Sequence, residues 1–209
     1  AFAADIADTD RNSVGDTHAD ANALNVIDVD AIAARLTTLM DDPSMVGLAV
    51  VIVEDGKIVH VKGYGETLAG TGDKVTTETV FRWASLSKGV ASTLAAKLDE
   101  DGIMPLNAPV SQYVTSLDLP EDGEDRATIA DVLSHRLGIV RNAYDNILER
   151  GKDPAEIRGR MSGLGIECPV GTCHAYQNVA FDSVAEMVKS STGEEYSAAS
   201  ERQLFKPLG

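Results

Sequence analysis

A serine and a lysine lie three residues apart in the segment FRWASLSK, residues 81–88. On a helix, residues three apart share a face, so Ser85 Oγ and Lys88 Nζ can be neighbours. A hydroxyl becomes a nucleophile when a base takes its proton, and an amine becomes a base when its charged form is disfavoured. Burial near the positive end of a helix serves both needs. The spacing therefore predicts a serine nucleophile for acyl transfer.

A plainer interpretation is a helix cap, in which Ser85 caps the first turn and Lys88 is solvated. The residues after the pair favour a buried helix over about residues 85–99, because apolar side chains recur there at helical spacing. No other lysine of the chain has a serine three residues before it. A lysine in the first turn also opposes the helix dipole, which a purely structural helix would avoid.

Composition excludes several classes of function. The chain has 209 residues and a formal net charge of -15, which argues against binding to nucleic acid or to anionic membranes. Apolar residues make up 44% of it, and no apolar run is long enough to span a membrane. It contains no Walker loop, dinucleotide fingerprint or Gly-x-Ser-x-Gly elbow. We therefore expect no cofactor, no metal, no nucleic acid and no membrane span.

The two cysteines, Cys168 and Cys173, have no His or Cys partners at zinc-ligand spacing. A disulfide in an oxidising compartment and two reduced thiols remain open. Residues 1–28 are rich in aspartate and lack apolar periodicity, which predicts a flexible acidic arm. Its first three residues resemble the end of a cleaved secretory signal. We expect a periplasmic or secreted protein.

Apolar patterning divides the rest of the chain into a first helix and β-hairpin over residues 29–80 and a mainly helical part over residues 81–209. A helix is predicted over 30–40, and strands over 46–53 and 57–61 with an Asp-Gly turn between them. Further helices are predicted over 85–99, 129–133, 154–161 and 179–191, the last stopped by Gly193.

The predicted hairpin poses a problem, because two strands do not make a stable independent sheet. The sequence offers no strand after residue 65, and it ends in Pro207-Leu208-Gly209, which is typical of a turn. We therefore expect the remaining strands in a C-terminal part that is missing here or in a complementary chain.

A tyrosine and an asparagine precede the helix predicted over 179–191. A phenol near a lysine ammonium has a lowered pKa, so Tyr176 could move a proton between Ser85 and a leaving group. Asn178 offers a donor and an acceptor, which suits it to hold a substrate amide and the lysine together. The alternatives are a core aromatic for Tyr176 and an N-cap for Asn178. We interpret His135 as structural, because it lies at the end of a short predicted helix.

These motifs, in this order, resemble the serine β-lactamase and penicillin-binding-protein superfamily, in particular its class C-like branch of DD-peptidases, D-aminopeptidases and carboxylesterases. The resemblance runs from about residue 46 to residue 209. It rests on residues 47–51 (GLAVV), 81–88 (FRWASLSK), 128–135 (TIADVLSH), 169–172 (PVGT), 176–178 (YQN) and 204–209 (LFKPLG). It implies an α+β fold, in which an antiparallel sheet flanked by helices accompanies a mainly helical subdomain.

The resemblance also implies roles for single residues. Ser85 would be acylated, Lys88 would activate it, Tyr176 would be general base and acid, and Asn178 would position the substrate. The family's third motif, Lys or His, a small residue and Gly on a later strand, is absent. The chain would then hold only half of the oxyanion hole, and the loss of one donor costs about 100- to 1000-fold in rate.

The resulting hypothesis is a serine hydrolase that forms an acyl-serine intermediate on an ester, an amide or a β-lactam, with a small-molecule or peptide substrate. One alternative is a non-catalytic binding or sensor module that retains the fold. The other is one fragment of a split enzyme, active only with its complement.

Overall fold

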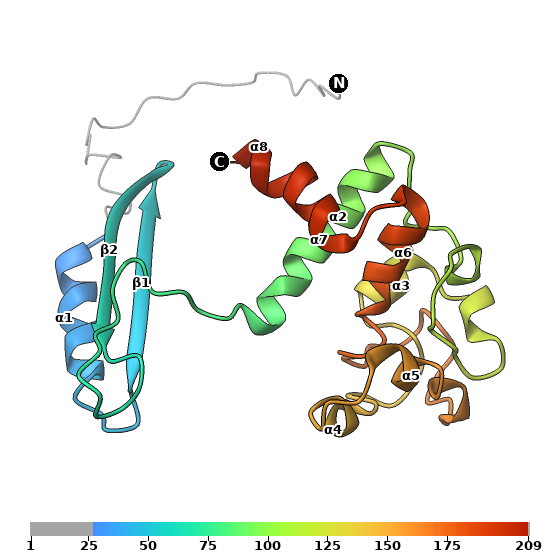
Figure 1. Ribbon diagram of the computed structural model, residues 1–209, viewed down its shortest axis with the longest axis horizontal. Helices are drawn as coiled ribbons and strands as arrows, with labels where there is room; N and C mark the ends of the chain where they lie inside the picture. The colour runs from blue at the N-terminus through green and yellow to red at the C-terminus, as the bar shows by residue number, and fades with distance from the viewer. Residues whose placement is uncertain (1–26, 209) are drawn as a thin grey trace, which may run out of the picture. The chain divides into compact units, whose positions relative to one another are not determined.

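A computed structural model of the chain describes residues 27–208. Most of the predicted acidic arm, residues 1–28, lies outside the described residues. The chain divides into two compact units, one ending at Phe81 and the other beginning at Arg82. Figure 1 shows the helices and strands of each unit. Among the described residues, no helix is both long and apolar enough to cross a membrane.

The first unit is built on an antiparallel hairpin of β1 (Gly47–Glu54) and β2 (Lys57–Gly65). Asp55 and Gly56 alone join the strands and have φ angles of 49° and 72°. Positive φ at both central residues defines the turn that matches the twist of a hairpin. The predicted hairpin is therefore present, and among the described residues its sheet has two strands.

The second strand continues beyond residue 61, where the sequence predicted its end. Glycines in this part of the strand allow the chain to pack closely against it. A Cβ on Gly63 would lie 2.3 Å from the carbonyl oxygen of Val75, so only glycine fits there. The strand thus runs on to Gly65 beside the segment that contains Val75.

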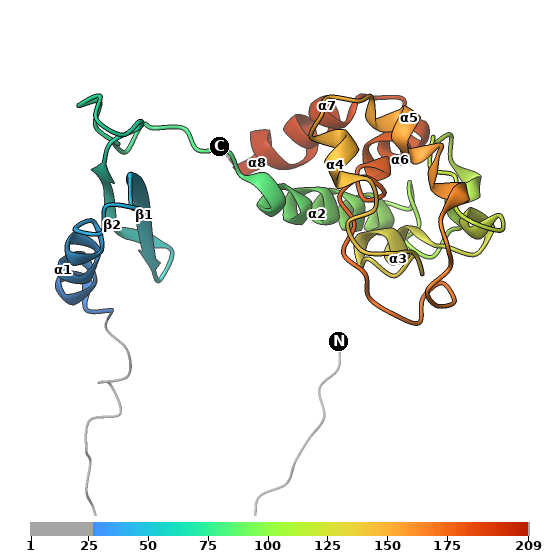
Figure 2. The ribbon, with the colours of Figure 1, turned by 90° about the horizontal axis from the view of Figure 1, so that it is seen from below.

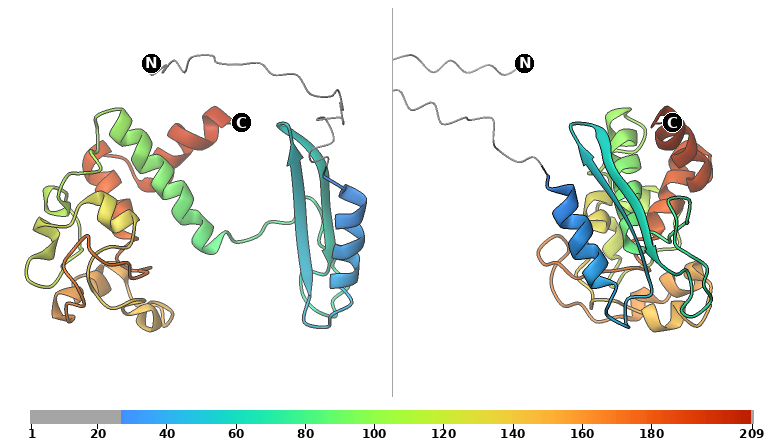
Figure 3. Two further views of the ribbon diagram at one scale, coloured as in Figure 1. Left: turned by 180° about the vertical axis from the view of Figure 1, so that it is seen from behind. Right: turned by 90° about the vertical axis from the view of Figure 1, so that its left-hand side faces the viewer.

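The helix α1 (Val29–Leu39) packs along this hairpin (Figure 3). Asp28 caps it, because its side chain accepts a hydrogen bond from the Ala31 N–H at 2.8 Å. Apolar side chains on the strands remain exposed: Val51, Val53, Ile58 and Val61. The first unit therefore presents an apolar sheet surface.

The second unit surrounds α2 (Ser87–Glu100), whose predicted apolar stripe is half-buried at Val90 and buried at the other four positions: Ala91, Leu94, Ala95 and Leu98. Figure 2 shows α2 beside the later helices, of which α6 and α7 contact it. These helices are α3 (Ile129–Leu133), α4 (Asp145–Leu148), α5 (Pro154–Arg158), α6 (Ser183–Thr192), α7 (Tyr196–Ser200) and α8 (Lys206–Leu208). A capping box of Thr128 and Asp131 begins α3.

Two predicted details are wrong. The helix predicted to begin at Val179 begins at Ser183, so Asn178 is not its N-cap. The C-terminal turn is helical instead: α8 follows a π-helical turn, Glu201–Phe205. Pro207, which has no backbone N–H, lies within α8 directly after this π-helical turn.

A buried arginine links α5 to α6. Arg158, whose side chain is 4% exposed, donates to Asp182 Oδ2 and Glu186 Oε1, each at 2.6 Å. Its Nε donates to Ser116 Oγ at 2.7 Å. Burial raises the pKa of Glu186, but hydrogen bonds, among them those from Ser116 and Arg158, outweigh burial and lower it overall. The ion pairs fix the helix into which the Asn178 segment leads.

Candidate active site

The structure brings Ser85 and Tyr176 together although they are 91 residues apart in the chain. Tyr176 Oη donates a hydrogen bond to Ser85 Oγ at 2.8 Å. Ser85 lies in a 3-10 turn, Ala84–Leu86, that leads directly into α2. Among the described residues, no group accepts a hydrogen bond from the Ser85 backbone N–H. This N–H is therefore free to bind an oxygen that develops negative charge.

Ala84, directly before the serine, has a φ angle of 47°. Non-glycine residues rarely adopt this left-handed conformation, which costs about 1–2 kcal/mol. Strain of this kind is retained where the surrounding structure enforces it, often at functional sites. It makes the turn that carries Ser85 sharper than the helical start the sequence predicts.

Lys88 lies in the first turn of α2, close to the phenol. Its Nζ is 4.9 Å from the centroid of the Tyr176 ring and 5.4 Å from that of Phe181. It donates to Asn178 Oδ1 at 2.7 Å. Within the described part of the chain, no direct hydrogen bond joins Lys88 Nζ to Ser85 Oγ. Because Ser85 is in the 3-10 turn and not in α2, the two side chains do not share one regular helical face.

Asn178 bonds to the lysine as predicted, but its donor is also occupied. Asn178 Nδ2 donates to Asp145 Oδ2 at 2.7 Å. Sequence reasoning missed Asp145, since no motif surrounds it and its partner lies 33 residues away. A substrate amide would therefore have to share the Asn178 amide with this carboxylate.

The segments that carry Asp145 and Asn178 are joined through their backbones. The Asn142 N–H donates to the Tyr176 carbonyl oxygen at 2.7 Å. The buried Gln177 donates from Nε2 to the Val140 carbonyl oxygen at 2.6 Å and accepts from the Ala143 N–H at 3.3 Å. These bonds hold the tyrosine segment in place without the help of any of the four predicted site residues' side chains.

His135 packs under the tyrosine, with their ring centroids 4.5 Å apart. Its Nδ1 accepts the Gln177 N–H at 3.2 Å, so this nitrogen carries no proton. Burial lowers the pKa of His135, and the charges of His174 and Lys88 lower it further. The neutral ring thus supports the Tyr176 segment, in agreement with the structural role expected from the sequence.

The electrostatics around Tyr176 favour loss of its proton. The polar interaction with Lys88 lowers the pKa of Tyr176 most. The hydrogen bond with Ser85 is the second largest cause and lowers the same pKa further. Slight burial and the charge of Asp145 act in the opposite direction and are outweighed. A phenol with a lowered pKa is a better general base near neutral pH than a free tyrosine.

A disulfide joins Cys168 to Cys173. The sequence alone leaves open whether these two cysteines form such a bond or remain reduced thiols. The same loop is held by Gly171, whose N–H donates to the Arg136 carbonyl oxygen at 2.8 Å. A Cβ on Gly138 would lie 2.2 Å from the carbonyl oxygen of Cys168, so the loop packs directly on the glycine. The disulfide thus closes a loop that ends three residues before Tyr176.

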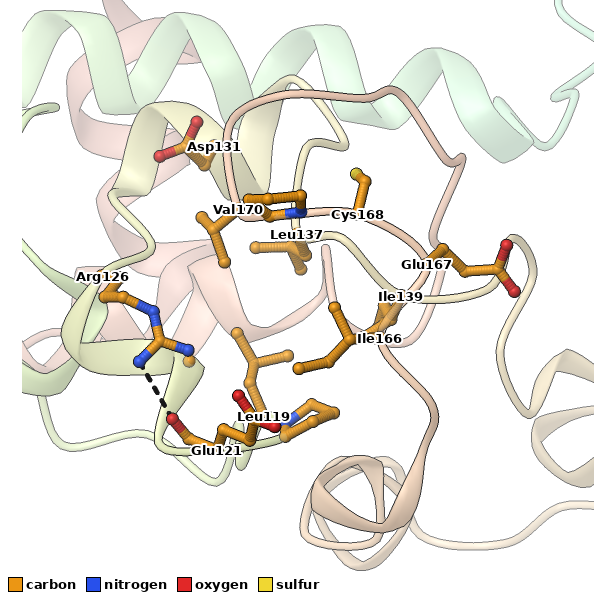
Figure 4. A pocket seen from close by; sticks show the side chains of 13 residues that line it. Leu119, Glu121, Arg126, Asp131, Leu137, Ile139, Ile166, Glu167, Cys168 and Val170 are labelled. Atoms are coloured by element: carbon orange, nitrogen blue, oxygen red, sulfur yellow. Dashed lines mark hydrogen bonds between the residues drawn. The ribbon is translucent and has the colours of Figure 1, made fainter.

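Hollows border the site on two sides. One of about 350 Å³ is lined by Tyr176, Arg141, His174 and Cys173, among others. A smaller one of about 170 Å³ is lined by Lys88 and Asn178, among others. A larger pocket of about 570 Å³, shown in Figure 4, is lined by none of the four predicted site residues. Ser85 lines neither of the two hollows that border the other site residues.

Comparisons with known proteins agree on one family. The Beta-lactamase family model matches residues 32–209. The D-alanyl-D-alanine-carboxypeptidase/endopeptidase AmpH of Escherichia coli is 27% identical over 168 residues, 78% of this chain and 43% of that protein. Esterase EstB of Burkholderia gladioli is 25% identical over 202 residues, 88% of this chain and 51% of that protein.

A solved structure shows the same fold. The octameric penicillin-binding protein homologue from Pyrococcus abyssi superposes with a TM-score of 0.76 at 22% identity, over 88% of this chain and 43% of that chain. The chain thus spans about half the length of the relatives it matches, or somewhat less.

Proposed function

The chain belongs to the β-lactamase family, and from this premise we propose that it is a serine hydrolase acting through an acyl-serine ester. Members of the family are hydrolases of several kinds, as the carboxypeptidase and esterase relatives illustrate. One observation carries the proposal: Tyr176 Oη lies 2.8 Å from Ser85 Oγ, beside a lysine. A fold retained only for binding would not need this contact.

In the proposed reaction, Tyr176 first releases its proton to solvent, and the nearby Lys88 ammonium stabilises the phenolate. The phenolate then accepts the proton of Ser85 Oγ. The serine oxygen bonds to the substrate carbonyl carbon, and the carbonyl oxygen becomes an oxyanion. When the bond to the leaving group breaks, Tyr176 gives its proton to that group. Water then attacks the ester by the same route, which releases an acid and restores Ser85.

The free N–H of Ser85 supplies one donor to the oxyanion. We propose that the second donor comes from the family's third motif, on further strands of the sheet, supplied by a C-terminal remainder or a complementary chain. The exposed apolar strand residues and the greater length of the relatives support this.

The proposed substrate is a small molecule or peptide with an ester, amide or β-lactam carbonyl. We propose that the hollow of about 350 Å³ beside Tyr176 receives the part of the substrate that leaves, because Tyr176 would protonate that part. The disulfide supports a periplasmic or secreted location, since such bonds persist in oxidising compartments.

Covalent labelling tests the proposal. A fluorophosphonate or a penicillin should add one acyl or phosphonyl group per chain, and peptide mapping should place it on Ser85. Ser85→Ala should abolish the adduct. The control is Ser111→Ala, which changes an exposed serine that is not one of the four predicted site residues, and this variant should still form the adduct. Reversible binding without an adduct, in the chain and in a form that carries the third motif, would favour the binding module instead.

A further inference from the structure

A carboxylate, an amide and an amine form a chain of hydrogen bonds behind the proposed nucleophile. Asp145 Oδ2 accepts from Asn178 Nδ2, and Asn178 Oδ1 accepts from Lys88 Nζ, each at 2.7 Å. We propose that Asp145 is a positioning residue, which acts through Asn178 to hold Lys88 beside Tyr176. This inference rests on the proposed function and assigns Asp145 a part in it.

The two partners of Asn178 determine how its amide is oriented. Lys88 Nζ can only donate, so it requires the amide oxygen, and an ionised Asp145 can only accept, so it requires the amide nitrogen. Without the carboxylate, the amide could rotate by half a turn. Its NH₂ group would then face the lysine, and two donors would oppose each other. Asp145 therefore excludes the orientation that releases Lys88.

The backbone holds Asp145 independently of these side chains. Asp145 is the first residue of α4, and Tyr144 before it has a φ angle of 62°. The Asn142 N–H bonds the Tyr176 carbonyl oxygen at 2.7 Å, which ties the segment before α4 to the segment of Asn178. Replacing the Asp145 side chain therefore leaves the attachment between the two segments in place.

Asp145 is also incompletely satisfied. Its Oδ1 is buried and has no hydrogen-bond partner among the described residues. Buried polar atoms without partners are rare, because each costs about 1–3 kcal/mol. A carboxylate kept there at such a cost is poorly explained by stability. It is explained by its action on Asn178 and by the negative charge it places near Lys88 and Tyr176.

Two substitutions separate hydrogen bonding from charge. In Asp145→Asn, the new amide oxygen can still accept from Asn178, so only the charge is lost. In Asp145→Ala, both are lost. Glu149→Gln, at the end of the same helix and exposed, makes the same change in charge at a carboxylate that has no hydrogen bond to Asn178 in the described structure. Since a hydrogen bond to a charged group contributes about 1.5–3 kcal/mol, the alanine variant should acylate about 10- to 100-fold more slowly. The acylation rate of the asparagine variant should fall by a smaller factor, and that of Glu149→Gln should not change.

A double-mutant cycle tests whether Asp145 acts through Asn178. If it does, Asp145→Ala should slow acylation in the native chain but not in an Asn178→Ala background. If the two effects multiply, the inference is overturned. Should Asp145→Ala fail to fold, as judged by its circular dichroism, the same cycle with Asp145→Asn decides.

A titration of Tyr176 provides a readout that needs no turnover. Asp145→Asn removes the Asp145 charge, which raises the pKa of this phenol, so this variant should have a lower Tyr176 pKa, as followed by NMR of tyrosine labelled with ¹³C at Cζ. Asp145→Ala also releases Lys88, which lowers the same pKa most, so its Tyr176 pKa should lie above that of Asp145→Asn. Glu149→Gln should leave it unchanged. If native protein forms no adduct but the titration shifts as expected, the proposed function fails while the positioning stands. Equal Tyr176 pKa values in Asp145→Asn and Asp145→Ala would overturn the positioning role itself.

Discussion

A single oxygen atom connects the tyrosine to the serine. Tyr176→Phe removes that atom and retains the ring that packs on His135. Because general acid–base catalysis contributes about 10²- to 10⁴-fold, Ser85 should be acylated more slowly by such a factor. The measurement is the pseudo-first-order rate of adduct formation by mass spectrometry.

Tyr113→Phe is the matched control for this loss, since it removes a phenol oxygen that has no hydrogen-bond partner among the described residues. It should leave the rate unchanged. An unchanged rate in Tyr176→Phe would mean that another group takes the serine proton.

Protonation of His135 should destabilise the second unit. Its pKa is lowered in the folded state, so folding favours the neutral ring. The resulting stability is complete above the pKa of an unfolded histidine, about 6.5, and is lost as pH falls through the folded-state value. Urea unfolding should therefore show a free energy that decreases below about pH 6.5.

His135→Asn should remove this part of the pH dependence. Asparagine tolerates the left-handed conformation of this residue, whose φ angle is 58°. His60→Asn, in the hairpin, should leave the dependence in place. If native protein and His135→Asn lose stability in parallel between pH 7 and pH 5, the histidine does not couple folding to protonation.

At the scale of helices, the Arg158 side chain holds α5 against α6. Arg158→Met would leave Asp182 and Glu186 without their shared partner. Because these two carboxylates are 57% and 27% exposed, the loss should be smaller than the cost of about 3–5 kcal/mol for removing one partner of a fully buried pair. Arg160→Met breaks an exposed pair with Glu156 and should cost less than about 1 kcal/mol. Denaturant unfolding of both variants measures the difference, and equal losses would contradict the importance of burial.

The elements that the sequence predicts well are those defined by local patterns. The stripe of α2 and the Asp55-Gly56 turn each act within a few residues, where periodicity and turn chemistry decide the structure. The start of α6 is not predicted correctly, because the apolar Val179 and Phe181 suit a helix as well as the irregular buried segment they form.

The site is predictable only as far as its motifs extend. Ser85, Lys88, Tyr176 and Asn178 belong to motifs that resemble those of a family, so the sequence alone is enough to name them. Asp145 belongs to none, and its contact with Asn178 depends on how two irregular segments pair. Long-range pairing of this kind leaves no periodic signal in one sequence.

At the scale of whole units, the sheet of the first unit has an apolar face that the other described residues of that unit leave exposed. Val51 pairs with Val61, and Val53 with Ile58, and these four side chains are 49–66% exposed. A patch of this kind promotes association. The chain should therefore bind a hydrophobic dye, and Val51→Thr with Val53→Thr should weaken that binding.

Val114→Thr, which changes an isolated valine that is 84% exposed, is the control and should leave dye binding unchanged. A form with the further strands that we propose should bind little dye. Equal dye binding with and without the two threonine substitutions would show that this face is not the patch.

The distance along the chain between the two halves of the site has a consequence during synthesis. Ser85 leaves the ribosome 91 residues before Tyr176, and Lys88 leaves it 90 residues before Asn178. At about 5–20 residues per second, the nascent serine waits about 5–20 s for its partners. Throughout that interval it is an ordinary alcohol, so the unfinished polypeptide is chemically inert towards the esters and amides of the cell that makes it.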